Sequence, residues 1–157
     1  MSNILFEEKQ KMDNIWALTI LALVSVVNWI LYFMMGYEEM TFFYTSLLVA
    51  SILSFIISKL TLYTKISPTT LYYKLTPFHF HYSTISRSDI VDGSIRQYKW
   101  FSEYGRRGKA KGKSGKAITI SGNFGLQLKL KSGELILFGT SQPEKLKDIL
   151  KKNWKIG

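Results

Sequence analysis

The sequence predicts an α+β membrane protein, in which an N-terminal transmembrane helical hairpin precedes a mostly antiparallel β-barrel or sandwich with a C-terminal amphipathic helix. Three observations predict this class: two long uncharged apolar runs, a following series of alternating segments rich in β-branched and aromatic residues, and helical spacing at the end of the chain. The expected divisions are an N-terminal segment (1–13), a membrane hairpin (14–58) and a β-rich domain (59–157).

The first apolar run, residues 14–37, reads NIWALTILALVSVVNWILYFMMGY and carries no charge. As a helix it would be about 36 Å long, which exceeds the ~30 Å hydrocarbon core of a bilayer. The second run, residues 40–58, reads MTFFYTSLLVASILSFIIS and would be about 28 Å long. Neither run has the polar face of a soluble helix, and the first is too long for the core of a signal peptide.

The charges that flank these runs predict their orientation. The short connection contains only acidic residues, whereas Lys9 and Lys11 precede the first run and Lys59 and Lys65 follow the second. Because basic residues remain on the cytoplasmic side, we expect both termini to lie in the cytoplasm. Aromatic residues expected at or near the membrane interfaces are Trp16, Trp29, Tyr32, Tyr37 and Tyr44.

Small residues recur every four positions in the second run and would share one helix face, which allows another backbone to approach closely. They are Ser46, Ala50, Ser54 and Ser58. In the first run, Asn28 is a polar group in lipid. We expect a hydrogen bond across a helix contact, in preference to a role in conduction, because no ionisable group accompanies it.

From residue 59 onward, seven alternating segments are separated by turn-forming clusters such as SPT, SRS and KSG. In GLQLKLK (125–131), alternate leucines share one face, and Ser132-Gly133 turns the chain into the last strand. Ser141 and Glu144 have the spacing of a helix capping box. The apolar face of the helix that follows comprises Leu146, Ile149, Leu150 and Trp154. This is the layout of a pleckstrin-homology-like (PH-like) domain.

Several segments carry a resemblance to a protein family. They are FEEKQ (6–10), ISPTTLYYKLTPFHF (66–80), RQYKWFSEYG (96–105) and SGNFGLQLKLKSGELILFGTSQPEKL (121–146). With the spacing between them, the chain resembles small bacterial membrane proteins of unknown function that have two transmembrane helices and a PH-like domain. The resemblance covers nearly the whole chain and implies this fold and a location in the bacterial cytoplasmic (inner) membrane, but it brings no activity.

The stretch YGRRGKAKGKSGK (104–116) concentrates basic residues and glycines and is expected to connect the fourth and fifth strands. Two interpretations stand side by side: a solvated connector, or a contact with anionic lipid headgroups. The basic candidates for lipid contact are Arg106, Arg107, Lys109, Lys111, Lys113 and Lys116. The aromatic candidates, which could dip into the interface, are Trp100, Phe101 and Tyr104.

The sequence offers little catalytic chemistry. Gly112-Lys113-Ser114 lacks the preceding glycine spacing and the following helix of a phosphate-binding loop. His79 and His81 would share one face of a strand, but there is no third histidine and no cysteine to complete a metal site. No nucleophile, base and acid can be grouped. We therefore expect no enzyme, no cofactor and no metal.

The charge distribution also suggests what the protein contacts. The net charge is +10, and nearly all basic residues lie beyond residue 58. The favoured function is a non-catalytic, membrane-anchored binding module that contacts anionic lipid. The alternative is a structural or assembly subunit, which would use the small-residue face to pair with another membrane helix or a second copy while the barrel docks a protein partner. Nucleic-acid binding is the least favoured, since no stacking platform on a strand is evident.

Overall fold

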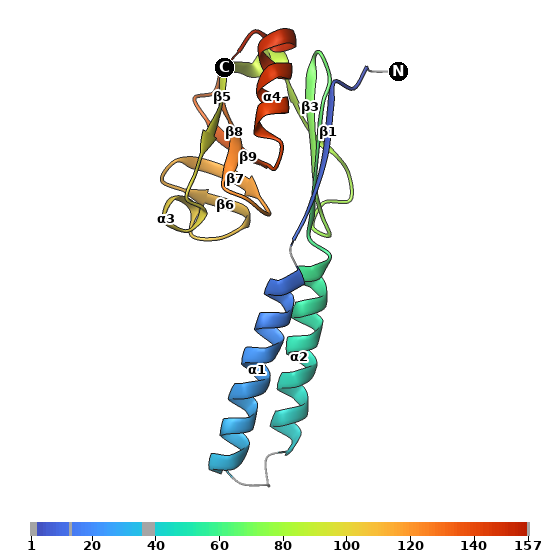
Figure 1. Ribbon diagram of the computed structural model, residues 1–157, viewed down its shortest axis with the longest axis vertical. Helices are drawn as coiled ribbons and strands as arrows, with labels where there is room; N and C mark the ends of the chain where they lie inside the picture. The colour runs from blue at the N-terminus through green and yellow to red at the C-terminus, as the bar shows by residue number, and fades with distance from the viewer. Residues whose placement is uncertain (1–2, 13, 36–39, 157) are drawn as a thin grey trace. The chain divides into compact units, whose positions relative to one another are not determined.

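The computed structural model describes residues 3–12, 14–35 and 40–156. The chain forms two units: a β-rich unit, which combines the residues up to Lys11 with Thr61–Gly157, and a helical unit, Met12–Leu60 (Figure 1). The predicted α+β class is confirmed. The predicted N-terminal segment is not separate, however, because it contributes a strand to the β-rich unit.

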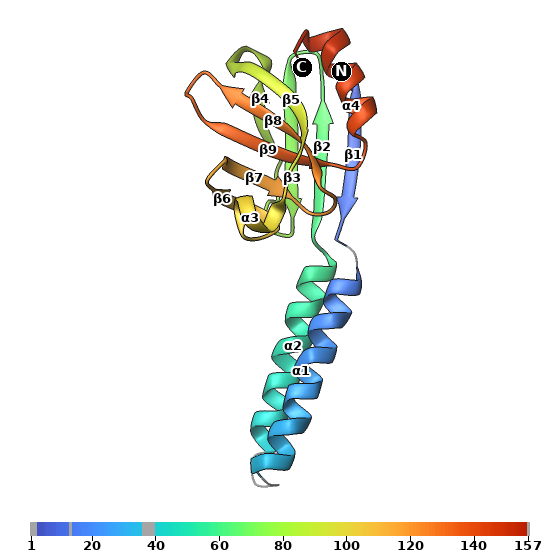
Figure 2. The ribbon, with the colours of Figure 1, turned by 60° about the vertical axis from the view of Figure 1, so that its left-hand side comes forward.

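The helical unit contains α1 (Asn14–Met35) and α2 (Met40–Ser58), which pack side by side (Figure 2). By length and composition, Ala17–Met34 is able to cross a membrane, and the described apolar part of α2, Tyr44–Ser58, is shorter. The exposed ring of Trp29 contacts those of Tyr32 and Phe33. Of the other predicted interfacial aromatics, Tyr44 is exposed, whereas Tyr37 and the side chain of Trp16 lie outside the described residues.

The first sheet has the antiparallel order β1-β2-β3-β4. Its strands are β1 (Phe6–Lys11), β2 (Thr61–Ile66), β3 (Thr70–Thr76) and β4 (Ser83–Ser86). Lys11 is paired with Thr61, and Thr61 with Thr76. The chain therefore leaves this sheet for the helices and returns from them at neighbouring positions of paired strands.

The second sheet has the order β5-β8-β9-β7-β6, in which only the β7–β9 pair is parallel. Its strands are β5 (Ile90–Gln97), β6 (Gly108–Gly112), β7 (Gly115–Thr119), β8 (Phe124–Leu130) and β9 (Leu135–Thr140). Leu126 and Leu128 are fully buried, as the alternation predicts, and Gly133 turns β8 into β9 with a φ of 81°.

The strand predicted for FHFHYSTI is mostly absent. Residues 77–82 form a turn in which the backbone N–H of His79 donates to the carbonyl of Leu75 at 2.7 Å, and pairing resumes only at Ser83. Pro77 has no N–H for a strand ladder. The prediction that His79 and His81 share a strand face was therefore wrong.

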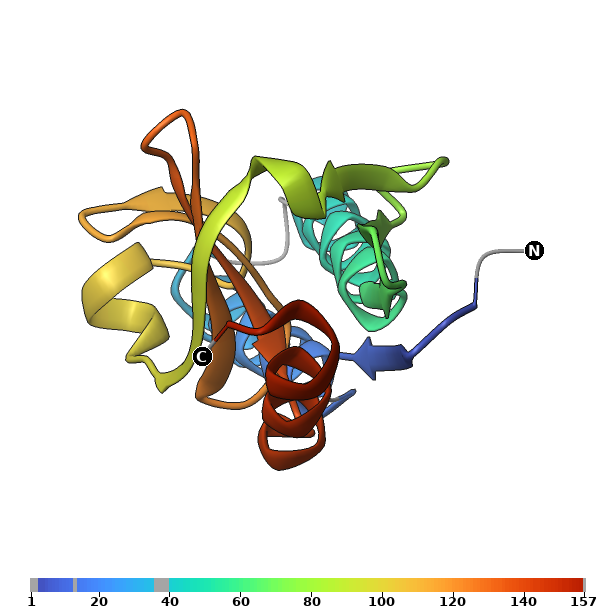
Figure 3. The same ribbon diagram turned by 90° about the horizontal axis from the view of Figure 1, so that it is seen from above.

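The C-terminal helix closes one end of the β-rich unit (Figure 3). It consists of α4 (Pro143–Ile149) and a wider turn, η3 (Leu150–Trp154). As predicted, Leu146, Leu150 and Trp154 are buried, and the indole N–H of Trp154 donates to the carbonyl of Ser67 at 3.0 Å.

The start of this helix differs from the predicted capping box. The N-cap position is occupied by Gln142 and has no side-chain cap. The hydroxyl of Ser141 donates instead to the carboxylate of Glu8 at 2.5 Å. A long-range polar partner has therefore replaced the local one.

Candidate functional site

The basic segment that the sequence places in a connector is itself a β-hairpin. It follows the short helix α3 (Trp100–Tyr104), runs through β6 and β7, and turns at residues 113–114. A Cβ atom on Gly112 would collide with the carbonyl oxygen of Glu103, and Gly115 has a φ of 99°, which favours glycine. The connector prediction was therefore wrong, because these glycines permit close packing and a tight turn.

One face of the hairpin packs on a small aromatic core. Ala110 and Ala117 pair across the hairpin and are buried with Tyr98, Tyr104 and Leu137. Tyr104 is only 5% exposed, and this burial raises the pKa of its hydroxyl. The assignment of Tyr104 to a lipid contact was therefore wrong, since its ring holds α3 on the hairpin.

Two of the six predicted basic contacts are engaged within the unit. Arg107 donates to the carbonyl of Ile120 at 2.7 Å, and its guanidinium lies 5.0 Å from the centroid of the Trp100 ring. Lys116 forms an ion pair with Glu134. These contacts hold the hairpin and the half-buried Trp100 in place. The side chains of Arg107 and Lys116 are therefore less available to an external partner.

The other four basic side chains are exposed, and the described part of the chain gives none of them an ion pair: Arg106, Lys109, Lys111 and Lys113. Lys109 and Lys111 alternate with a buried alanine along β6 and so point away from the core. On the neighbouring helix α3, the ring of Phe101 is 72% exposed. The surface thus combines unpaired positive charge with an apolar ring.

This surface also has an interpretation that needs no ligand. β6 is the last strand of its sheet, and lysines on an edge strand prevent pairing with another chain. The two roles are compatible, because a lysine that repels a strand edge can still contact an anionic headgroup.

A partly buried arginine secures α3. The guanidinium of Arg96 donates to the carboxylate of Glu103 at 2.7 Å, to the hydroxyl of Tyr104 at 3.0 Å and to the side-chain oxygen of Gln127 at 2.8 Å. The bond from Arg96 lowers the pKa of Glu103, and the backbone N–H of Lys99 adds to this effect. Glu103 is therefore an ionised structural partner rather than a free acid.

A second polar cluster, which sequence reasoning missed, lies inside the β-rich unit. The carboxylate of Glu8, on β1, is buried and accepts hydrogen bonds from the hydroxyl of Thr140 and the backbone N–H of Ser141, both at 2.7 Å. Gln10 is also buried and donates to the carbonyl of Gly139 at 2.7 Å. These bonds join the first strand of the chain to the end of β9.

In the helical unit, the predicted small-residue face packs against α1. The buried Asn28 accepts a hydrogen bond from the hydroxyl of Ser46 at 2.5 Å. The hydroxyl of Ser54 donates to the carbonyl of Ala17 at 3.1 Å, and Ala50 is 3% exposed. The prediction that Asn28 finds a partner across a helix contact is confirmed.

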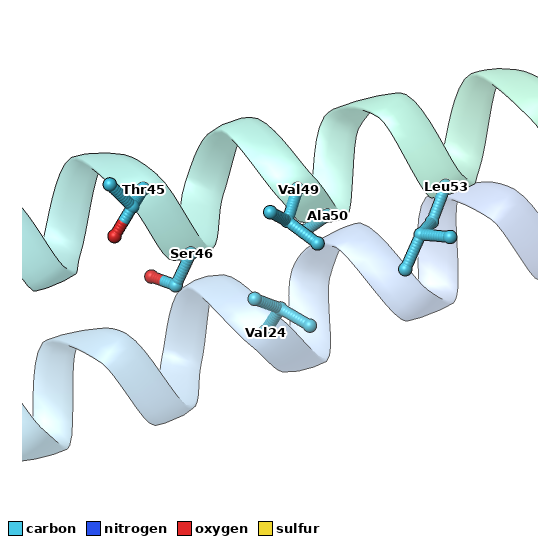
Figure 4. A pocket seen from close by; sticks show the side chains of 6 residues that line it. All are labelled: Val24, Thr45, Ser46, Val49, Ala50 and Leu53. Carbon is cyan, nitrogen blue, oxygen red and sulfur yellow. The ribbon is translucent and has the colours of Figure 1, made fainter.

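The partner of this face in the described chain is α1, so pairing of the same face with another membrane helix stays a prediction. Three of its four residues are engaged between the helices, and Ser58 donates to the carbonyl of Phe55 in its own helix. An apolar groove of about 350 Å³ runs beside the contact (Figure 4). It is lined by Val24, Thr45, Ser46, Val49, Ala50 and Leu53. None of these six side chains is ionisable, so the groove offers shape but no acid–base chemistry.

The two histidines have different surroundings. The ring of His79 is half-buried, with its centroid 6.4 Å from that of Tyr73, whereas His81 is exposed. Within the described ranges, no three His, Asp or Glu side chains lie close enough together to hold a metal ion.

In comparisons with known proteins, no family model matches the chain and no curated protein matches it.

Proposed function

We propose that this protein is a membrane-anchored, non-catalytic binding module. In this proposal both helices span the membrane, and the β-rich unit is a PH-like domain at the cytoplasmic face. Its exposed bases, Arg106, Lys109, Lys111 and Lys113, contact anionic lipid headgroups, and Phe101 enters the interface beside them. The family resemblance drawn from the sequence remains a prediction that agrees with this arrangement.

The observation that carries the proposal is the place at which the helices are inserted in the chain. They lie between β1 and β2, which are paired along their whole length. If α1 crosses the bilayer, α2 must cross back, because a strand cannot pair through a membrane with the sheet to which it belongs. Lys9, Lys11, Lys59 and Lys65 lie on the side that holds this sheet, which favours the cytoplasm.

The position of the basic hairpin also supports the proposal. Figures 1 and 2 show α3 and β6 at the end of the β-rich unit where β1 ends and β2 begins. The chain enters and leaves the β-rich unit at this end, so it is the end expected to lie nearest the bilayer. α4 lies at the opposite end of the unit.

The energy of the headgroup contact is suited to orienting the β-rich unit on the membrane rather than to bringing the chain to the membrane. A base near an anionic leaflet contributes about 1 kcal/mol, so four contribute at most about 4 kcal/mol before ordering costs. A chain that is already anchored needs none of this energy to reach the membrane. The contact would instead select one orientation of the β-rich unit against the surface.

The test uses the full chain in liposomes of phosphatidylcholine, with or without phosphatidylglycerol. Because the chain has no cysteine, Lys113→Cys carries a single donor dye in the hairpin turn, and an acceptor dye is placed on lipid headgroups. We expect energy transfer to be higher in the anionic liposomes and to fall with added salt.

Two matched variants test whether the response to anionic lipid depends on the charge of the hairpin or on the overall charge of the chain. Replacing Arg106, Lys109 and Lys111 by Gln should abolish the response to anionic lipid. Replacing Lys147, Lys151 and Lys152 by Gln removes the same charge from exposed positions on α4 and η3 and should preserve it. Equal energy transfer in both liposomes for the parent chain would reject the headgroup contact and leave edge protection as the role of the lysines.

A further inference from the structure

We propose that the β3–β4 turn, residues 77–82, is an interfacial anchor whose Phe78 and Phe80 side chains enter the headgroup region of the bilayer that holds α1. The inference rests on the membrane anchoring proposed above, but not on the headgroup contact of the hairpin.

The turn presents its phenylalanines outward from a fixed base. Phe80 is 83% exposed and Phe78 is 64% exposed. Between them, His79 points inward: its ring is half-buried against Tyr73, and its backbone N–H donates to Leu75 at 2.7 Å. The exposure therefore belongs to an ordered turn, in which two large apolar rings are presented to the surroundings within three residues. Apolar side chains gathered at one exposed place are typical of protein or membrane interaction sites.

The register of the first sheet places this turn close to the point where the chain crosses to the helices. Thr76, the last residue of β3, is paired with Thr61, and Thr61 is paired with Lys11. Only residues 59 and 60 separate α2 from β2, and each residue extends the chain by at most about 3.6 Å. If the helices span the membrane, Thr61 is therefore held within about 11 Å of the point where the chain leaves α2. Thr76, which begins the turn, lies one strand spacing from Thr61, about 5 Å.

The surroundings of the turn favour lipid over a second copy of the chain. The Tyr82 ring, at the end of the turn, has the ammonium group of Lys74 at 5.8 Å from its centroid. That of Lys65, which also pairs with Glu7, lies at 5.5 Å. Aromatic rings flanked by lysines are typical of the membrane interface, where the rings lie among the headgroups and the ammonium groups reach the phosphates. A site beside the membrane crossing meets lipid in every molecule, at any protein concentration.

The test uses the full chain in nanodiscs of neutral phosphatidylcholine. A spin label is attached at Phe80→Cys, and in a second sample at Phe78→Cys; both positions are exposed, so neither change removes core packing. The control label is at Ser132→Cys, in the exposed β8–β9 turn at the other end of the unit (Figures 1 and 2). We expect the turn labels to be accessible to oxygen and protected from a water-soluble nickel chelate, and the control label to show the reverse.

Two outcomes would overturn the inference. One is nickel accessibility at both Phe78 and Phe80 equal to that at Ser132. The other is a protection that disappears when each nanodisc holds a single chain, because it would identify a contact between copies. Since neutral lipid is used, this result is independent of the response to anionic lipid measured for the hairpin, and the two proposals can fail separately.

Discussion

At the scale of single residues, two neighbouring glutamates on β1 have opposite surroundings. Glu7 is exposed and forms an ion pair with Lys65 at 3.0 Å, whereas Glu8 is buried and accepts bonds from Thr140 and Ser141. Glu8→Ala should lower the free energy of unfolding by about 3 kcal/mol, because buried donors lose their acceptor and a cavity forms.

Glu7→Ala is the matched control, and it should cost less than about 1 kcal/mol because its ion pair is at the surface. The measurement is thermal unfolding of the full chain in detergent, followed by near-ultraviolet circular dichroism. Equal losses for the two variants would contradict the structural role assigned to Glu8.

The bond between Arg96 and Glu103 predicts a dependence of stability on pH. Arg96 lowers the pKa of Glu103 below its ordinary value of 4.5. The stabilisation is therefore complete above about pH 4.5 and is lost as the pH falls through the lower pKa of the folded state. Glu103→Gln should cost about 1 kcal/mol at neutral pH.

The difference in stability between the parent chain and Glu103→Gln should shrink as the pH falls below the ordinary pKa of 4.5. Unfolding temperatures measured from neutral to acidic pH test this prediction. Asp148→Asn, at an exposed position on α4, controls for the loss of a carboxylate elsewhere. A difference that stays constant down to strongly acidic pH would show that Glu103 acts only through packing.

At the scale of elements, the β-rich unit needs β1 to be complete. The backbone N–H of Met12 donates to the carbonyl of Leu60 at 3.0 Å, so these residues are placed to flank a tight turn. A chain in which residues 13–59 are replaced by Asn-Gly should fold as a soluble β-rich protein, because this dipeptide favours two-residue hairpins. The fragment 59–157 lacks β1 and should not fold stably.

Circular dichroism and thermal unfolding compare the two chains: the joined chain should show a strand spectrum and a cooperative transition. In the joined chain, Phe6→Ala should lower the free energy of unfolding by about 3 kcal/mol, because Phe6 is 2% exposed. A fragment 59–157 that unfolds cooperatively at the same temperature as the joined chain would show that β1 is dispensable.

The same elements show how far the sequence predicts the structure. Uncharged length identified α1 and α2, and alternating leucines identified β8, because each signal is local and strong. β1 was missed because its buried face includes Glu8 and Gln10, whose partners lie at the far end of the chain. β6 was missed because a segment rich in glycine and lysine normally indicates disorder. The reason for glycine at position 112 is that any larger side chain would collide with the backbone of Glu103, and this contact exists only in the folded chain.

At the scale of the whole molecule, the pairing of β1 with β2 requires both ends of the chain to share one side of the membrane if the helices span it, as proposed above. Asn3→Cys and Asn153→Cys, at exposed positions, should both react with an impermeant maleimide in inverted vesicles and neither in intact spheroplasts. Glu39→Cys, between the two predicted spans, should react in the opposite pattern. Labelling of Asn3 and Asn153 from opposite sides would be incompatible with the β1–β2 pair.

The interrupted first sheet also has a consequence for biosynthesis. β1 leaves the ribosome first, but its partner β2 follows only after both helices have been made. If the helices span the membrane as proposed, β1 must remain unpaired while they enter it. A chain that inserted only one helix would leave β1 across the bilayer from the rest of its sheet, without its edge strand and the buried bonds of Glu8. Folding of the β-rich unit would thus act as a checkpoint for correct membrane insertion, and a failed chain would be exposed to proteases as an incomplete sheet.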